Sequence, residues 1–378
     1  MPSIPGAVGG SYVLRQPFIA AEQAINWFPE TVQGQGKRPK YQKGRAGLRA
    51  FATVTDTPGR GMFAQDGRCF VAVGATFAEV FEDGTTTAYG SITNTNGLPV
   101  WMCSNGSAGH QLFLTADGTG YIFDLDANTL TALSGDFPAN AWQPVFMDGY
   151  FLVSIRDTRQ FRWSALEDGL TWDPLDVAER SIASDNIVAF IRSHRQLWLI
   201  GSRTTEVWYD QGDPLIPFAP IQDAVIEWGC GAGYSAQRTQ STLAWIGQNE
   251  LGGGVVVVAN GFQPDKVSTY AIDLNLQDSG NLEFVHASAF QQKGHDFYQI
   301  NLPTNESDLS PVLDFTEARL GSANPWHHRG MWDVDTGGFT QDLAAAHAYA
   351  FAKPLMVSRA DGTIYWLRDD VYDDGVVP

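Results

Sequence analysis

The sequence predicts an all-β fold, namely a β-propeller of about seven four-stranded blades. Seven times along the 378 residues, a short apolar run is followed by a turn and a second apolar run, and these recurrences are about 40 to 60 residues apart. Asp-Gly and Asn-Gly, which tolerate the positive φ of tight hairpin turns, occur at many of the reversals. Because one four-stranded sheet cannot bury both of its faces, the repeats are expected to pack side by side in a ring.

The paired apolar runs give two expected strands in each repeat. They are Cys69 to Gly74 with Phe77 to Phe81, Leu112 to Ala116 with Tyr121 to Asp124, Phe151 to Ile155 with Phe161 to Ser164, Leu197 to Gly201 with Glu206 to Tyr209, Leu243 to Ile246 with Val255 to Ala259, Phe297 to Leu302 with Val312 to Phe315, and Leu355 to Ser358 with Ile364 to Leu367. The seventh repeat has no clear fourth strand. The ring would therefore have six blades if this last hairpin stays outside it.

Two regions are expected along the chain. Residues 1–57 stand outside the repeat and form an N-terminal extension, and residues 58–378 form the propeller. Within the extension, Ala20 to Trp27 is read as a short helix that Pro29 stops. The segment Leu48 to Val54 has strand character, and we expect it to supply the missing outer strand of the last repeat and so to close the ring.

Composition argues against several classes of protein. The net charge of −18, from 42 acidic and 24 basic residues, repels a polyphosphate at long range and disfavours a grip on nucleic acid. Three cysteines, Cys69, Cys103 and Cys230, lie far apart inside apolar runs, so we expect buried thiols rather than a disulfide frame or a metal cluster. Neither a secretion signal nor an apolar run long enough to span a membrane is expected.

The segment Ser164-Ala-Leu-Glu-Asp-Gly-Leu-Thr-Trp172 is the most motif-like stretch. It resembles the Asp-box turn of sialidase-type propellers with the spacing off by one, and that turn is structural and remote from the active site. A sialidase would also need an arginine cluster and a Tyr and Glu nucleophile pair. Arg162, Arg192 and Arg203 occur singly on different repeats, so we expect the turn to serve stability.

No other pattern indicates catalysis or metal binding. His327 and His328 are neighbours in an expected strand, where adjacent side chains point to opposite faces, so the two cannot easily bind one metal. The remaining histidines lie singly on separate repeats: His110, His194, His286, His295 and His347. No Gly-x-Ser-x-Gly motif is present, and no glycine-rich loop opens a helix. We therefore expect no enzyme activity, no metal and no cofactor.

One basic stretch locally reverses the acidic charge of the chain. It is read either as a solvated loop or as a contact for an acidic surface, which would be DNA or a neighbouring copy of the chain. The candidate interface residues are Lys37, Arg38, Lys40, Lys43 and Arg45 in this stretch, and Asp369, Asp370, Asp373 and Asp374 near the other end of the chain.

Several segments, in their order and spacing, resemble the packaged-DNA stabilisation proteins of short-tailed bacteriophages, which are tail hub or nozzle subunits. The segments are Asn26-Trp-Phe-Pro-Glu30, Gly47-Leu-Arg49, Trp163 to Leu175, Leu197 to Tyr209, Gly229-Cys-Gly231 and Val267 to Ile272. Members of that family continue past the acidic Asp369 to Asp374 stretch, whereas this chain ends at Pro378.

The resemblance implies a structural virion protein that is made in the bacterial cytoplasm and has no catalytic role. It implies a ring of copies, six in number, below the portal, with the portal or adaptor and distal tail proteins as partners. DNA would be retained in the head and later pass through the channel without sequence-specific binding, and a negative lumen would let it slide. The alternatives are a carbohydrate-binding or glycoside-hydrolase propeller, with paired carboxylates and stacked aromatics over the axis, and a protein-binding propeller scaffold.

Overall fold

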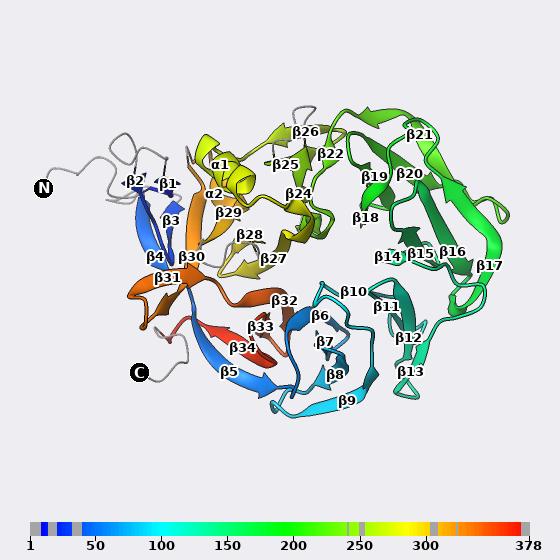
Figure 1. The fold of residues 1–378 in the computed structure, drawn as a ribbon, viewed down its shortest axis with the longest axis horizontal. Helices are drawn as coiled ribbons and strands as arrows, with labels where there is room; N and C mark the ends of the chain where they lie inside the picture. The colour runs from blue at the N-terminus through cyan, green and yellow to red at the C-terminus, as the bar shows by residue number, and fades with distance from the viewer. Residues whose placement is uncertain are drawn as a thin grey trace, which may run out of the picture.

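The computed structural model is a β-propeller of seven antiparallel sheets around a central axis (Figure 1). It describes residues 9–13, 21–31, 40–239, 242–248, 254–302, 309–322 and 324–371. The predicted fold class is confirmed with seven blades, because the last hairpin joins the ring. Each of the seven predicted pairs of runs forms two neighbouring strands of one blade.

The first four blades are meanders of four strands. Blade 1 contains β6 (Gly59–Gln65), β7 (Arg68–Val73), β8 (Thr76–Val80) and β9 (Thr86–Ser91). Blade 2 contains β10 (Trp101–Ser104), β11 (Gln111–Ala116), β12 (Thr119–Asp124) and β13 (Thr129–Ala132). Blade 3 contains β14 (Ala141–Met147), β15 (Tyr150–Ile155), β16 (Gln160–Ala165) and β17 (Asp168–Glu179). Blade 4 contains β18 (Ile187–Ser193), β19 (Gln196–Gly201), β20 (Thr205–Asp210) and β21 (Phe218–Ile226).

The last three blades are less regular. In blade 5, both β22 (Gly229–Cys230) and β23 (Gln237–Arg238) pair with β24 (Leu243–Gln248), and β25 (Gly254–Asn260) and β26 (Gln263–Lys266) follow. Blade 6 has five strands, β27 (His286–Gln292), β28 (His295–Asn301), β29 (Ser310–Asp314), β30 (Trp326–Asp333) and β31 (Gly338–Gln341). Blade 7 contains β32 (Ala344–Ala350), β33 (Lys353–Ser358), β34 (Thr363–Arg368) and β5 (Gly47–Thr53). The helical segments are α1 (Tyr270–Asp278), α2 (Phe315–Arg319), η1 (Gly233–Ser235) and η2 (Leu282–Phe284).

Ring closure joins the two ends of the chain. Strand β5, which covers most of the predicted strand Leu48 to Val54, pairs antiparallel with β34 and is the outer strand of blade 7. The register runs from Gly47 opposite Arg368 to Thr53 opposite Thr363. Leu48 has no exposed surface and packs in a cluster with Met356 and Leu367 of the same blade and Phe297 of blade 6.

The N-terminal residues before β5 form a hairpin that packs on blade 6. Strand β3 (Trp27–Thr31) pairs with β4 (Lys40–Gly44), and the shorter β1 (Tyr12–Val13) pairs with β2 (Ala21–Glu22). The predicted helix at Ala20 to Trp27 is wrong in its described part. Its backbone instead bonds to β30, since Asn26 N–H donates to the His328 carbonyl and His328 N–H to the Ala24 carbonyl. Tertiary pairing outweighs a weak local helix preference here.

Apolar clusters lie between neighbouring blades. Val71 and Val73 of blade 1 pack with Leu355, Val357 and Ile364 of blade 7, and similar clusters follow around the ring. The three cysteines are free thiols, with Cys69 and Cys230 buried and Cys103 half-buried. Burial raises the pKa of Cys69 and of Cys230 to about 12, so these thiols are protonated at neutral pH.

The substitution Leu48→Ala tests how much β5 contributes to the ring. Removing this buried side chain is expected to lower the free energy of unfolding by about 2–5 kcal/mol, because it leaves a cavity between blades 6 and 7. Urea unfolding followed by tryptophan fluorescence measures the change. Arg49→Ala, at the exposed neighbouring position of the same strand, is the control and is expected to change stability little. Equal losses for the two variants would contradict a closing role for Leu48.

Candidate functional site

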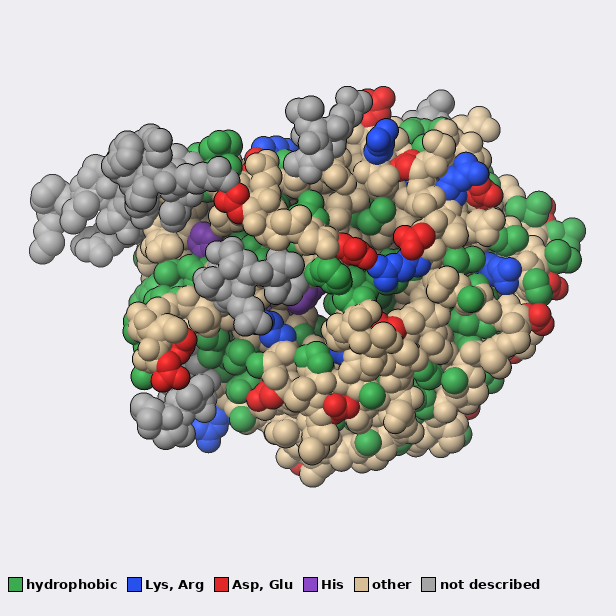
Figure 2. All heavy atoms as spheres, viewed as in Figure 1, with side chains coloured by type: hydrophobic (Ala, Val, Ile, Leu, Met, Phe, Trp, Pro, Cys, Tyr) green, Lys and Arg blue, Asp and Glu red, His purple; other side chains and the backbone are tan. Residues whose placement is uncertain are grey.

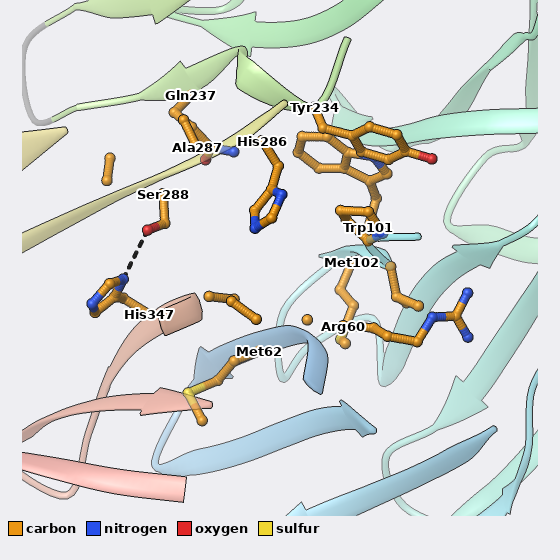
Figure 3. Close-up of a pocket in the computed structure, with 16 residues that line it drawn as sticks. Arg60, Met62, Trp101, Met102, Tyr234, Gln237, His286, Ala287, Ser288 and His347 are labelled. Atoms are coloured by element: carbon orange, nitrogen blue, oxygen red, sulfur yellow. Dashed lines mark hydrogen bonds between the residues drawn. The ribbon is translucent and has the colours of Figure 1, made fainter. Parts of the chain in front are cut away.

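A cavity of about 220 Å³ lies at the centre of the ring, where the inner strands of several blades meet. Figure 2 shows the hollow on one face, and Figure 3 shows the side chains that line it. The principal ones are Arg60, Trp101, Tyr234, His286 and His347, from five different blades. Among the described residues that line this cavity, none is Asp or Glu.

Arg60 is the one Lys or Arg among the described residues that line the cavity, and its guanidinium already has hydrogen-bond partners. Nε donates to the Leu98 carbonyl at 2.7 Å, and Nη1 donates to the carbonyls of Gly74 at 2.9 Å and Thr93 at 2.7 Å. Nη2 lies 3.1 Å from Asp117 Oδ2. Burial lowers the pKa of Arg60, and Asp117 opposes this effect. Arg60 therefore ties blade 1 to the β9–β10 and β11–β12 connections, and little of its hydrogen-bonding capacity is left for a ligand.

Two histidines face the cavity in neutral form. His347 Nδ1 lies 2.8 Å from Ser288 Oγ, and its ring stacks on Phe290 with centroids 4.0 Å apart. His286 Nε2 lies 3.2 Å from Asn301 Nδ2. Burial lowers the pKa of His286 to about 4 and that of His347 to about 3. At neutral pH both rings are uncharged.

Aromatic rings form the other wall of the cavity. The rings of Trp101 and Tyr234 lie almost parallel, with their centroids 6.1 Å apart. The centroids of the Trp142 and Tyr234 rings are 4.8 Å apart. The Arg156 guanidinium lies 4.3 Å from the Trp142 ring centre and pairs with Glu283 of η2. This ion pair joins blade 3 to the segment that enters blade 6. Packed rings and paired polar groups thus make up this wall of the cavity, except that Nε1 of Trp101 is buried without a hydrogen-bond partner among the described residues.

The Asp-box-like turn of blade 3 is a structural clamp that also reaches blade 2, since Gly169 N–H donates to Gln111 Oε1 at 2.7 Å. Asp168 accepts hydrogen bonds from Leu170 N–H at 2.9 Å and Thr171 Oγ1 at 2.7 Å. Trp172 Nε1 donates to the Gly169 carbonyl at 2.7 Å, and its buried ring packs against Phe113 and Phe137. The arginines that a sialidase active site would need make other contacts. Arg162 donates to the Asp136 carbonyl and Arg192 to the Phe146 carbonyl, and neither they nor Arg203 line the central cavity.

The predicted basic interface residues contact their own chain where the structure describes them. Lys40 Nζ lies 3.4 Å from Ser322 Oγ, Lys43 Nζ lies 2.8 Å from Glu30 Oε2, and Arg45 Nη1 lies 3.7 Å from the buried Asp342 Oδ2. Lys37 and Arg38 lie outside the described residues. Lys43 and Arg45 therefore help to hold the N-terminal extension in place.

The acidic interface candidates also contact their own chain where the structure describes them. Asp369 accepts from Gln292 Nε2 at 2.8 Å and lies 3.3 Å from Lys293 Nζ, and Asp370 pairs with Arg368. Asp373 and Asp374 lie outside the described residues. Gly47 N–H donates to the Val371 carbonyl at 3.1 Å, so the chain just after Arg45 lies beside the chain just after Asp370.

The Asn26-Trp-Phe-Pro-Glu30 segment has a role that sequence reasoning did not assign, because it docks the extension on blade 6. Asn26 exchanges side-chain hydrogen bonds with the backbone of Gly330, at 2.8 and 3.1 Å, from a φ of 60° that asparagine tolerates. Phe28 packs edge-on against His295 and Phe297. The neighbouring Thr31 donates twice to Glu317, each time at 2.7 Å.

The two adjacent histidines of β30 do not form a metal site. His327 lies against Phe28 and Phe297, and His328, one residue further along the strand, points to the other face. Within the described part of the chain, no group of three or more His, Cys, Asp or Glu could hold a metal ion. Burial lowers the pKa of His328 to about 4.

Acid should destabilise the fold through His328. Its pKa is about 4 when folded and about 6.5 when unfolded, so between these values the unfolded chain binds more protons. The free energy of unfolding should therefore fall as pH drops through this window, by at most about 1.4 kcal/mol per pH unit for this group. Urea unfolding at several pH values is expected to show a weaker pH dependence for His328→Gln than for the wild type. His110→Gln, at an exposed position, should keep the wild-type slope, and a wild-type slope in His328→Gln would contradict the assignment.

Solved structures share the fold at low sequence identity. The extracellular domain of a hybrid two-component system from B. thetaiotaomicron matches with a TM-score of 0.55 and 7% identity over 85% of this chain. This chain spans 40% of the length of that structure. A chain of a mitotic checkpoint complex matches with a TM-score of 0.51 and 14% identity, over 91% of this chain and 96% of that one. A streptogramin B lyase matches with a TM-score of 0.50 and 8% identity, over 85% and 97%. These likenesses show the propeller fold alone.

Sequence comparison identifies the family. No curated protein matches the chain. Residues 12–328, however, match the phage stabilisation family that is described as Bacteriophage P22 Gp10, beta-propeller. The match includes the docking segment at Asn26, the closing strand β5 and the first five blades. The chain therefore belongs to this family of phage packaged-DNA stabilisation proteins.

Proposed function

We propose that this chain is a structural subunit of a short phage tail, where it forms part of a hub or nozzle below the portal. In this role it retains packaged DNA in the head and later forms part of the ejection channel. The observation that carries the proposal is the family match over residues 12–328. The virion is then the site of action, and no helix in the described residues is long and apolar enough to cross a membrane.

The central cavity supports a role without catalysis. Glycoside hydrolysis needs two carboxyl groups across a sugar site, and the described lining of the cavity contains no Asp or Glu. The Arg60 guanidinium is bonded to three carbonyls and one carboxylate, and the two histidines are neutral. The same features disfavour the carbohydrate-processing alternative.

The charge of the chain supports passage of DNA rather than capture. A net charge of −18 opposes binding of the phosphate backbone, which proteins normally grip with Lys and Arg. On the face shown in Figure 2, acidic and basic side chains are interspersed and form no basic track. DNA is thus held back as the contents of a closed channel, without sequence-specific contacts. The partners in this proposal are further copies in a ring of six, the portal or adaptor, and distal tail proteins.

Electron microscopy of phage particles labelled with an antibody against this chain tests the proposal. The label is expected at the tail, directly below the head, because a hub subunit stays in the mature virion. Purified protein serves in parallel for assays on glycosides, where no turnover is expected. Label absent from virions, together with glycoside turnover, would contradict a structural role and favour the carbohydrate-processing propeller.

A further inference from the structure

Exposed apolar side chains gather at two edges of the molecule. Among the described residues, the three most exposed large apolar side chains are Leu175 at 85%, Leu215 at 81% and Val334 at 80%. Leu175 and Leu215 belong to blades 3 and 4, whereas Val334 belongs to blade 6. Isolated exposed apolar residues are ordinary, but such groups of them mark interaction surfaces.

We call the first surface the aliphatic edge. It consists of Leu175, Leu215 and Ile216, together with the carboxylates of Asp173, Asp176, Asp210 and Asp213. Leu175 lies in an irregular part of β17, and Leu215 lies between β20 and β21. Leu175 N–H donates to Asp173 Oδ1 and Leu215 N–H to Asp213 Oδ1, both at 2.8 Å. The two exposed leucines, on neighbouring blades, therefore make the same local hydrogen bond to an aspartate two residues earlier.

The carboxylates of Asp176 and Asp210 lie where the blade 3 part and the blade 4 part of the aliphatic edge meet. Burial, followed by the charges of Asp210 and Asp176, raises the pKa of Tyr150. Asp176 of blade 3 and Asp210 of blade 4 therefore both lie near Tyr150. The ring of Tyr150 also packs on that of Phe218, with the ring centroids 5.8 Å apart. Beside them, Tyr209 and Asp210 line an open groove together with Asp148 and Arg195. This edge is apolar, acidic and hollowed.

The second surface, the aromatic edge, consists of the exposed side chains of the N-terminal hairpin and of the β30–β31 hairpin. They are Trp27, Tyr41, Trp332, Val334 and Phe339. Trp332 and Phe339 contact each other edge-on at 5.1 Å. Aromatic side chains on a raised hairpin are typical anchors of protein interfaces.

The aromatic edge also carries positive charge. Strand β4 contains Lys40 and Lys43, of which Lys43 pairs with Glu30 of β3, and strand β5 contains Arg49. Arg49 is exposed, and among the described residues no carboxylate forms an ion pair with it. The carboxylate of Asp333 on the neighbouring hairpin is used by its own turn, where it accepts from Asp335 N–H and Thr336 Oγ1. Arg49 thus gives the aromatic edge an exposed positive charge, opposite in sign to the carboxylates of the aliphatic edge.

The two edges lie at opposite ends of the molecule. Strand β31 and the N-terminal hairpin lie at the left of Figure 1, and β17 with the loop that joins β20 to β21 lies at the right. Figure 2 shows apolar and acidic side chains together at the right edge. Two unlike surfaces on one molecule bind each other only between copies, and each copy then offers a free edge to the next.

We propose that the aliphatic edge of one copy docks on the aromatic edge of the next copy. This inference rests on the proposed tail role, for which it names the surfaces that join neighbouring subunits. Trp27 and Tyr41 would enter the region of the groove, and Arg49 would face the carboxylates of Asp173 and Asp213. A contact of this kind is heterologous, so it builds a ring or a chain of copies.

Paired variants test the proposal. The first is Leu175→Ser with Leu215→Ser, the second is Trp332→Ser with Val334→Ser, and the control is Tyr270→Ser. Tyr270 is 61% exposed on α1, outside both edges. Mass photometry of the wild type and of the control is expected to show assemblies. At the same concentration, each double variant should be monomeric, with its urea unfolding unchanged because all four sites are exposed.

Mixing the two double variants gives the decisive result. Each variant retains one intact edge, so the mixture is expected to form a heterodimer and to stop there, since both remaining edges are defective. No heterodimer in the mixture, or wild-type assembly by either double variant, would overturn the inference. A wild type that stays monomeric at its highest soluble concentration would overturn it as well. These assembly results test only the docking surfaces. Antibody label on the virion tail would still support the proposed tail role, and its absence would count against that role without testing the docking surfaces.

Discussion

The pairing of β5 with β34 is the constraint on which the rest of the structure depends. A blade of a propeller has two apolar faces, and each is buried only by the next blade. An open row of blades would leave two faces in water, at blade 1 and at blade 7, and the β5–β34 ladder holds those two faces together. Because β5 comes from the N-terminal end and β34 from the C-terminal end, the ring cannot close before most of the chain is present.

Closure explains why the extension is fastened so firmly to blade 6. Residues that precede β5 pass over blade 6, where Asn26, Phe28 and Thr31 each make a specific contact. The junction of blades 6 and 7 also contains a buried carboxylate, Asp342, which accepts from Gln299 Nε2 at 3.1 Å and from Ala344 N–H at 2.9 Å. Polar contacts of this kind need one register to be satisfied, so they help to specify where the extension docks.

The fold could be predicted from sequence because it depends on a repeated local pattern. Alternating apolar runs and turn dipeptides are sufficient to mark strands such as β7 and β8. The helix expected before Trp27 was wrong, because pairing with β30 decides that conformation and no local signal reveals it. The cavity was beyond prediction as well. Arg60, Trp101, Tyr234, His286 and His347 come from five blades, and no sequence spacing links them.

The distribution of satisfied and unsatisfied groups separates the centre of this molecule from its rim. At the centre, the Arg60 guanidinium and His347 already have partners, whereas Nε1 of Trp101 is buried and has no hydrogen-bond partner among the described residues. At the rim, the side chains of Leu175, Leu215 and Val334 remain in water. Water contact of this kind costs free energy that burial against another surface would recover. In the proposed tail role, the surfaces through which this propeller acts would therefore lie on its circumference, where one copy meets the next.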